Sequence, residues 1–256
     1  MQTHRQAVNA QFDPQAQAYL TSSAHAQGPD LIRAQALLAQ HLPAKAQCLD
    51  VGCGAGHLSF AIAPGVARVL ALDPAAAMLS VVAAEAERRA LRNIEVQAGQ
   101  VEALPFEDAS FCLVATRFSA HHWTRLESGL REMRRVLRPG GYLLLIDIEG
   151  SEDALVDTHL QTIELLRDRS HVKNRTPSEW ARQLADAGFD VSAHETWPHR
   201  LDFTPWVERM RTPPARVALL RELQREAPQE VRQALNIGED GSFTPTTGLY
   251  WARARA

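Results

Sequence analysis

Two carboxylates and three glycines are spaced as they would be around a ligand at the edge of a parallel sheet. Asp50 opens the run Asp-Val-Gly-Cys-Gly-Ala-Gly, which follows a short apolar segment and precedes a helix-like one. Gly52, Gly54 and Gly56 lack the Cβ atoms that would hinder a sharp turn and a close ligand. The N–H groups of such a helix start can receive polar groups. Asp73 ends the next apolar run, where a carboxylate can accept two hydrogen bonds from a ribose diol.

The glycine spacing distinguishes two classes of nucleoside cofactor. A dinucleotide fold uses G-x-G-x-x-G to seat a pyrophosphate on the helix N-terminus. Counted from Gly52, the last glycine of that pattern would fall at His57, so it is absent. Asp50 would repel a pyrophosphate but suits a ligand with an ammonium or sulfonium group. An NAD-dependent oxidoreductase is therefore the less favoured alternative.

Four segments occur in the order typical of one enzyme family. They are Asp50–Gly56, Gly99-Gln-Val-Glu-Ala-Leu-Pro-Phe106, Ser110-Phe-Cys-Leu-Val114 and Glu132-Met-Arg-Arg-Val-Leu-Arg-Pro-Gly-Gly141. Together they resemble the class I S-adenosylmethionine-dependent methyltransferases, most closely the small-molecule enzymes of the ubiquinone/menaquinone type. The resemblance implies a Rossmann-like, doubly wound α/β sheet of seven strands, mostly parallel with an antiparallel last strand, plus a helical lid. It also implies that S-adenosylmethionine is the cofactor and a small molecule the methyl acceptor.

The resemblance also assigns residues to the cofactor. Asp50, the three glycines and Asp73 match its first two binding segments, and Gln100 and Val101 match the adenine position. Gln100 departs from the family's usual Asp, although an amide oxygen can still accept a weaker hydrogen bond. Met78 lies at helical spacing behind Pro74, so it can touch the adenine or pack in the core.

The resemblance extends to a lid over the methionine end of the cofactor. Tyr19 and His25 match a Y-x-x-S-x-x-H segment that relatives fold over that end. The loop Arg167–Val172 matches an R-D-x-S-H-V segment, which is either part of a polar network on the substrate side or an ordinary solvated turn.

A basic and aromatic segment, Arg117-Phe-Ser-Ala-His-His-Trp123, follows the fourth expected strand. Ligands of open α/β sheets bind at the carboxyl ends of strands, where strand order reverses, so Arg117 is expected to face the cofactor and substrate. His122 is a candidate general base, or else it packs in the core or satisfies a backbone group. Adjacent histidines are expected to point apart, and no carboxylate or cysteine has matching spacing, so no metal site is predicted.

Plainer interpretations remain for the other site residues. The glycines can form a tight turn that holds no ligand, and Asp73 can be a helix N-cap. A cofactor-binding protein without catalytic activity, acting through partners, also stays open, because the family that the chain resembles has few obligatory catalytic side chains.

Composition limits the function classes. The chain has 256 residues, 45% of them hydrophobic, and a net charge of −3, which gives no electrostatic footprint for nucleic acid. No apolar run is long enough to span a membrane and the N-terminus lacks a signal-peptide core. The three cysteines form no C-x-x-C pair, so free thiols and a cytoplasmic location are expected. The oligomeric state stays open.

One domain over 1–256 is expected, with an N-terminal lid segment at 1–28, a cofactor-binding core at 29–150, and sheet completion with lid insertions at 151–256. Apolar runs predict strands at 47–51, 66–72, 93–98, 111–116, 142–148, 191–197 and 248–253. Helical periodicity predicts helices at 27–41, 56–63, 74–90, 124–137, 153–167, 177–187, 213–226 and 228–236. The N-terminal 26 residues are polar and are expected to be ordered only if they pack as part of the lid.

Overall fold

A seven-stranded sheet forms the centre of the protein in a computed structural model that describes residues 3–12, 15–20 and 28–255. Its strands are β1 (Gln47–Val51), β2 (Arg68–Asp73), β3 (Ile94–Ala98), β4 (Phe111–Arg117), β5 (Leu137–Ile148), β6 (Phe189–Pro198) and β7 (Thr246–Ala254). The order across the sheet is β3-β2-β1-β4-β5-β7-β6. Strands β1 to β5 pair in parallel, whereas β7 runs antiparallel to β5 and β6. The predicted mixed sheet is confirmed, with its last strand inserted between β5 and β6.

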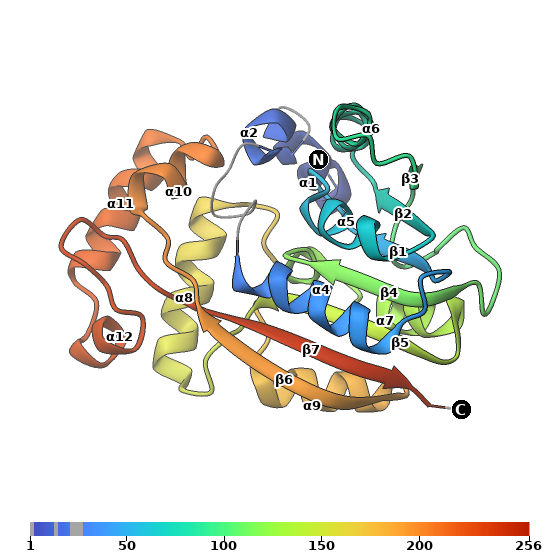
Figure 1. Ribbon diagram of the computed structural model, residues 1–256. Helices are drawn as coiled ribbons and strands as arrows, with labels where there is room; N and C mark the ends of the chain where they lie inside the picture. The colour runs from blue at the N-terminus through green and yellow to red at the C-terminus, as the bar shows by residue number, and fades with distance from the viewer. Residues whose placement is uncertain (1–2, 13–14, 21–27, 256) are drawn as a thin grey trace.

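Helices cover both faces of this sheet (Figure 1). The α-helices in the described ranges are α1 (His4–Phe12), α2 (Ala16–Leu20), α4 (Pro29–His41), α5 (His57–Ile62), α6 (Ala76–Arg88), α7 (Leu126–Val136), α8 (Ala154–Arg167), α9 (Pro177–Asp186), α10 (Phe203–Arg209), α11 (Pro214–Arg225) and α12 (Gln229–Ala234). None of the helices in the described ranges is long and apolar enough to cross a membrane.

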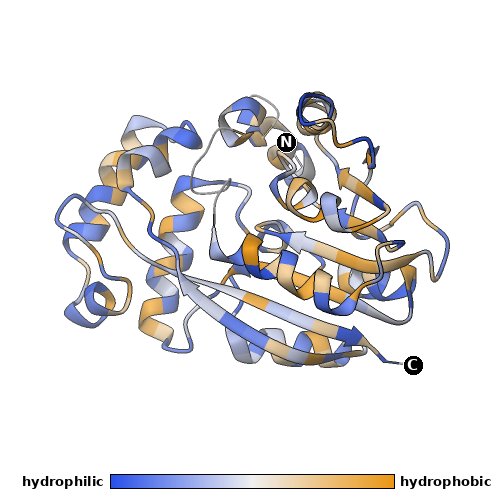
Figure 2. Ribbon diagram, in the orientation of Figure 1, coloured by the Kyte–Doolittle hydropathy of each residue, from blue (hydrophilic) through white to orange (hydrophobic). Residues whose placement is uncertain are grey.

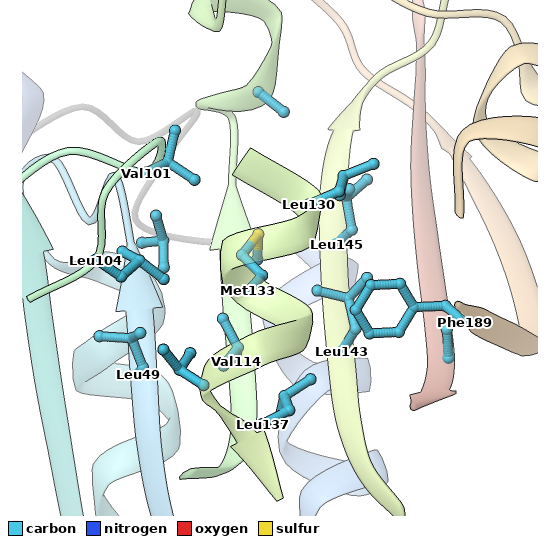
Figure 3. Close-up of a cluster of buried hydrophobic side chains, with 14 of the residues drawn as sticks. Leu49, Val101, Leu104, Val114, Leu130, Met133, Leu137, Leu143, Leu145 and Phe189 are labelled. Atoms are coloured by element: carbon cyan, nitrogen blue, oxygen red, sulfur yellow. The ribbon is translucent and has the colours of Figure 1, made fainter. Parts of the chain in front are cut away.

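The alternation of side chains along each strand divides the core into two layers. Cys48 and Leu113 face α4 and α5, whereas their neighbours Leu49 and Val114 face α7 and α9. Figure 3 shows the second layer, in which Met133 of α7 lies over side chains of the central strands. Strand β1 is buried on both faces, and its apolar residues Cys48, Leu49 and Val51 are interrupted only by the site residue Asp50.

The amphipathic helices confirm the period expected from the sequence. Helix α7 buries Leu126, Leu130, Met133 and Val136, which recur every three or four residues along one face. Figure 2 shows the matching contrast between apolar central strands and helices of mixed hydropathy, such as α4 and α8, around them. This apolar face fixes how α7 packs on the sheet.

A further apolar cluster lies to one side of the sheet, among α8, α10, α11 and α12 (Figure 1). Trp206, Phe203 and Phe243 form its centre, with Trp206 and Phe243 rings edge to face at 4.9 Å. These helices are inserted after β5 and between β6 and β7. They supply side chains to the site described below, although their action as a lid stays a prediction.

The N-terminal segment packs onto this insertion through its helices α1 and α2. The His4 ring lies 2.9 Å from the carbonyl oxygen of Ser170, and Gln11 donates to the Met210 carbonyl at 2.8 Å. Figure 1 shows α2 between α6 and α10. The polar sequence of this segment did not predict either helix, because long-range packing stabilises them.

Several boundaries differ from the sequence prediction. Strand β5 begins at Leu137, because Phe111 pairs with Leu137 before the register shifts, so Pro139-Gly140-Gly141 lies within the strand instead of only ending a helix. Strand β3 is exposed over Glu95–Ala98, so helices do not cover both faces of the sheet at this edge. Helix α10 was not predicted; Pro205 lies in its first turn, where a missing N–H breaks no helical bond.

Candidate functional site

Two adjoining cavities open at the carboxyl ends of β1, β2 and β4. The larger cavity has a volume of about 290 Å³ and the smaller about 130 Å³. Strand order reverses between β1 and β4, which is where doubly wound sheets bind ligands. The residues that line both cavities are Phe12, Gly52, Gly54, Met78, Phe118 and His122. A ligand at these shared residues would reach into both spaces.

The glycine loop forms the floor of both cavities. Gly52 and Gly54 have φ of +66° and +51°, a region that disfavours other residues. A Cβ on Gly52 would stand 2.0 Å from the Ser119 Oγ, whereas a Cβ on Gly54 would meet nothing within 4 Å. Gly54 therefore leaves open space beside the backbone. Gly56 lines neither cavity, and its Cβ would meet Phe60 at 2.9 Å, so its role in the structure is the start of α5.

Asp50 places a buried carboxylate in the wall of the smaller cavity. One oxygen, Oδ2, accepts a hydrogen bond from the Ser59 hydroxyl at 2.6 Å. The other, Oδ1, is buried and has no hydrogen-bond partner among the described residues. Burial raises the pKa of Asp50 to about 6, against the lowering effect of Ser59 and with a smaller contribution from Asp73. The unsatisfied oxygen suits a positively charged or hydrogen-bond-donating ligand group.

Asp73 lies in the larger cavity and holds the glycine loop. Its Oδ2 accepts from the Gly54 N–H and its Oδ1 from the Ala75 N–H, both at 2.9 Å. Helix α6 begins at Ala76 with Ala75 as its N-cap, so the alternative that Asp73 is the helix cap is wrong, as is the placement of Pro74 in the helix. The carboxylate instead ties the glycine loop to the turn that follows β2.

The three residues predicted at the adenine all line the larger cavity. Gln100 and Val101 follow β3, and Gln100 forms a bridge with Ala103 that bends the chain back. Val101 is buried and also belongs to the core. Met78 is only 1% exposed and lines both cavities. The two interpretations of Met78, core packing and ligand contact, therefore do not exclude each other.

Arg117 lies in the smaller cavity as part of a buried ion pair. Its Nε donates to Asp30 Oδ2 at 2.5 Å, and both side chains are only 6% exposed. Its guanidinium lies over the Phe118 ring at 4.4 Å. Asp30 was not predicted, because α4 is distant in sequence and nothing in the sequence indicates the pairing.

The lid segment with Tyr19, the segment Arg117–Trp123 and the loop Arg167–Val172 meet in the smaller cavity. Tyr19 from α2 lines it, together with members of the other two segments: Arg117, Phe118, His121, His122, Arg167, Asp168 and His171. The Tyr19 hydroxyl donates to the Met210 Sδ at 3.0 Å, and the His57 ring lies 3.0 Å from the Tyr19 carbonyl oxygen. These contacts fix α2 between the sheet and α10. His25 lies outside the described residues.

His122 stands at the junction of the two cavities. Its Nδ1 lies 3.0 Å from the Ser170 carbonyl oxygen, so Nδ1 donates there and Nε2 carries the lone pair. The Phe12 ring packs edge-on at 5.1 Å. Burial, followed by the nearby His121, lowers the pKa of His122 to about 4. Its predicted role as a general base remains a prediction.

His121 has a stronger partner than its neighbour. Its Nδ1 lies 2.6 Å from the Asp147 Oδ1, and its backbone N–H donates to Oδ2 at 3.0 Å. Burial opposes its charged form, but the charge and hydrogen bond of Asp147 outweigh burial and raise its pKa. The expectation that the two histidines point apart is wrong, since their ring centroids lie 4.2 Å apart. Within the described ranges, no three metal-ligating side chains gather as a cation site.

Other residues of the site were missed by sequence reasoning. Asp147 lies one residue before the carboxyl end of β5, a position that could have signalled it. Glu164 and Arg209 line the smaller cavity from α8 and α10, and neither had a motif to indicate it. All three cysteines are free, as expected, and burial raises the pKa of the Cys53 thiol in the cavity wall.

Comparisons with known proteins agree with this arrangement. A family model described as a methyltransferase domain matches residues 49–145, which run from β1 into β5. The uncharacterized protein YafE of Escherichia coli K12 is 42% identical over 75% of this chain and 93% of its own length. The uncharacterized methyltransferase YcgJ of Bacillus subtilis is 31% identical over 79% of each chain. Its crystal structure superposes with a TM-score of 0.81, 28% identity, and coverage of 88% of this chain and 99% of that one.

Similarity to quinone-modifying enzymes is confined to a shorter part of the chain. The ubiquinone/menaquinone biosynthesis C-methyltransferase UbiE of Rubrivivax gelatinosus is 33% identical over 39% of this chain and 38% of its own length. The long matches, the sheet order and the acidic glycine-rich loop after β1 agree with one another. The chain therefore belongs to the class I S-adenosylmethionine-dependent methyltransferases.

Proposed function

We propose that this enzyme methylates a small molecule bound in the smaller cavity, with the nucleoside half of the cofactor in the larger one. The observation that carries the proposal is the junction of the two cavities at Gly52, Gly54 and His122. A methyl donor that spans this junction would present its reactive end to the smaller cavity. Alignment there is the main contribution expected of the protein.

The residues present fit S-adenosylmethionine. The unsatisfied Oδ1 of Asp50 matches the positively charged end of the cofactor, and the open space at Gly54 admits a close ligand. Asp73 would hold the ribose, and Gln100 with Val101 would hold the adenine. When bound, the cofactor supplies a methyl group already activated by its sulfonium. Tyr19 and Arg117 line the cavity at the methionine end.

The size of the smaller cavity favours a small acceptor. Its volume of about 130 Å³, part of which the methionine end of the cofactor would fill, is no larger than an engineered cavity of roughly 150 Å³ that binds benzene. Helices α1 and α2 pack over it through Phe12 and Tyr19, both of which line it. A small site that two helices partly cover supports a metabolite acceptor over a polymer.

Two measurements test this proposal. Calorimetry should show binding of S-adenosylmethionine and S-adenosylhomocysteine with micromolar affinity, roughly −8 kcal/mol at 1 μM, and no binding of NADH. Release of S-adenosylhomocysteine should then be measured across a metabolite panel. Absence of binding by folded protein would contradict the cofactor assignment. Binding without turnover of any panel member would favour the alternative of a catalytically silent partner protein.

A further inference from the structure

Three histidine rings gather in the wall of the smaller cavity. The His121 centroid lies 4.2 Å from that of His122 and 5.8 Å from that of His171, and all three line the cavity. Charged rings this close repel one another in a poorly solvated site. The cluster therefore favours one protonated ring at a time, and the hydrogen bonds around it determine which ring that is.

Two of the three rings are held neutral by their surroundings. The Ser170 carbonyl accepts from His122 Nδ1 at 3.0 Å. His171 Nε2 lies 2.9 Å from the Gln161 Oε1, an amide oxygen that also accepts the Asn174 N–H at 3.0 Å. Neutral acceptors give little stabilisation to an imidazolium, and the Asp168 Oδ2 lies 4.0 Å from His122 Nε2, beyond hydrogen-bond distance. Burial lowers the pKa of His122 to about 4 and that of His171 to about 2.

The third ring is paired with a buried carboxylate. Asp147 is 1% exposed, and its Oδ1 lies 2.6 Å from His121 Nδ1. Backbone N–H groups of His121 and Ile148 donate to the same carboxylate at 3.0 and 2.9 Å, which fixes its orientation. This arrangement places the proton of the neutral ring on Nδ1. Nε2 of His121 makes no hydrogen bond to any residue that the structure describes, and its lone pair is left for a ligand.

We propose that His121, oriented by Asp147, is the general base of the reaction and that the methyl acceptor presents an ionisable hydroxyl group. The inference rests on the proposed function. A neutral hydroxyl is a weak nucleophile until its proton leaves, whereas a neutral amine needs no base for the transfer itself. The acceptor oxygen forms a bond to the methyl carbon and the carbon–sulfur bond breaks, with its electron pair remaining on sulfur. The hydroxyl proton passes to Nε2 of His121, and Asp147 stabilises the imidazolium that results.

Charges on every neighbouring element act on this ring. Glu164 of α8 and Asp168 of the following loop favour the imidazolium, in addition to Asp147 of β5. Arg175 is a cation whose charge interacts with Asp147, and its Nη1 donates to the Ala120 carbonyl at 3.3 Å. The titratable and charged groups around His121 are His122, Asp147, Glu164, Arg167, Asp168, His171, Arg175 and Arg209. Asp147 is in direct contact with the ring and its charge outweighs burial, so His121 is the ring able to accept the proton.

The first experiment requires no substrate. In the S-adenosylhomocysteine complex, the ring C–H resonances of His121 should titrate in NMR above the ordinary histidine value of about 6.5. D147N should move that midpoint below the ordinary value, because burial then outweighs the weaker attraction of Glu164 and Asp168. The proposal is wrong if the wild-type midpoint lies below 6.5, or if D147N leaves it in place.

The second experiment uses turnover of substituted phenols of graded acidity as hydroxyl probes. We expect H121A to lose on the order of 10²–10⁴-fold in kcat, to keep its affinity for S-adenosylhomocysteine, and to regain activity with added imidazole. H159Q, which removes a histidine of α8 that contacts Gln224 instead of the cavity, is the control and should keep wild-type rates.

Retention of more than a tenth of the rate in H121A, or loss without rescue by imidazole, would overturn the assignment. Methylation of amines or thiols but of no hydroxyl probe would refute the proposed base while leaving the methyltransferase function intact. Failure of the folded wild type to bind the cofactor would instead refute the proposed function.

Discussion

Replacement of Asp50 by Asn should stabilise the free protein above pH 6. The pKa of Asp50 is raised from 3.8 to about 6 in the folded state. When the wild type folds, the Asp50 carboxylate must therefore either lose its hydration while charged or bind a proton. A difference of about two pH units corresponds to about 3 kcal/mol. Because the folded pKa is the higher one, this loss of stability is absent below pH 3.8, develops as pH rises to about 6, and is constant above.

The same substitution should weaken cofactor binding. Asp50 lines the smaller cavity, and its Oδ1 is buried without a hydrogen-bond partner among the described residues. An uncharged amide there would lose a charge-assisted interaction with the cofactor of about 1.5–3 kcal/mol. Affinity for S-adenosylmethionine should therefore fall roughly 10- to 100-fold. Binding to the wild type at pH 6 should also release protons, because the cofactor favours the ionised carboxylate.

Urea denaturation at pH 4, 5, 6 and 8 measures the first effect, and calorimetry in buffers of different ionisation heat measures the second. The buried amide of D50N adds a contribution that does not depend on pH, so the pH dependence of the stability difference is the decisive quantity. D186N, a change at an exposed position of α9, is the matched control. A stability difference that does not change from pH 4 to 8 would show that the pKa of Asp50 is not raised by folding. Unchanged cofactor affinity would show that Asp50 does not lie in the cofactor site.

Other substitutions test the remaining parts of the site. Asp73→Ala should weaken cofactor binding by roughly 10- to 100-fold in calorimetry; a change below threefold with a sharply lower Tm would assign the residue to loop structure alone. Gln100→Asp should maintain or tighten binding of S-adenosylhomocysteine, and a tenfold loss would mean that it does not contact the adenine amine. Gly52→Ala should lower stability by about 1–3 kcal/mol, since its Cβ would lie 2.0 Å from Ser119, whereas Gly65→Ala, with nothing within 4 Å, should not.

The local sequence predicted the elements whose patterns are set by their own residues. Strand β1 was predicted at its observed bounds, because it is buried on both faces and reads as an apolar run. The glycines were recognised because a sharp turn from strand to helix requires residues without a Cβ atom. Asp73 was recognised because it lies at the carboxyl end of a strand, where ligands of such sheets bind. The family followed from the order of such segments.

Contacts between distant segments were decided only by the tertiary structure. Helices α1, α2 and α10 are short and have weak patterns, so their stability comes from packing partners that the local sequence does not reveal. The sequence indicated His122, whereas the fold places the buried carboxylate against His121. The short turn that follows β4 determines which of the two histidine rings faces Asp147. The register of β4 with β5 determines where Asp147 lies relative to that turn. The sequence therefore determined what kind of site this is, and the packing of β5, α8 and α10 around it decided which side chains carry its charge.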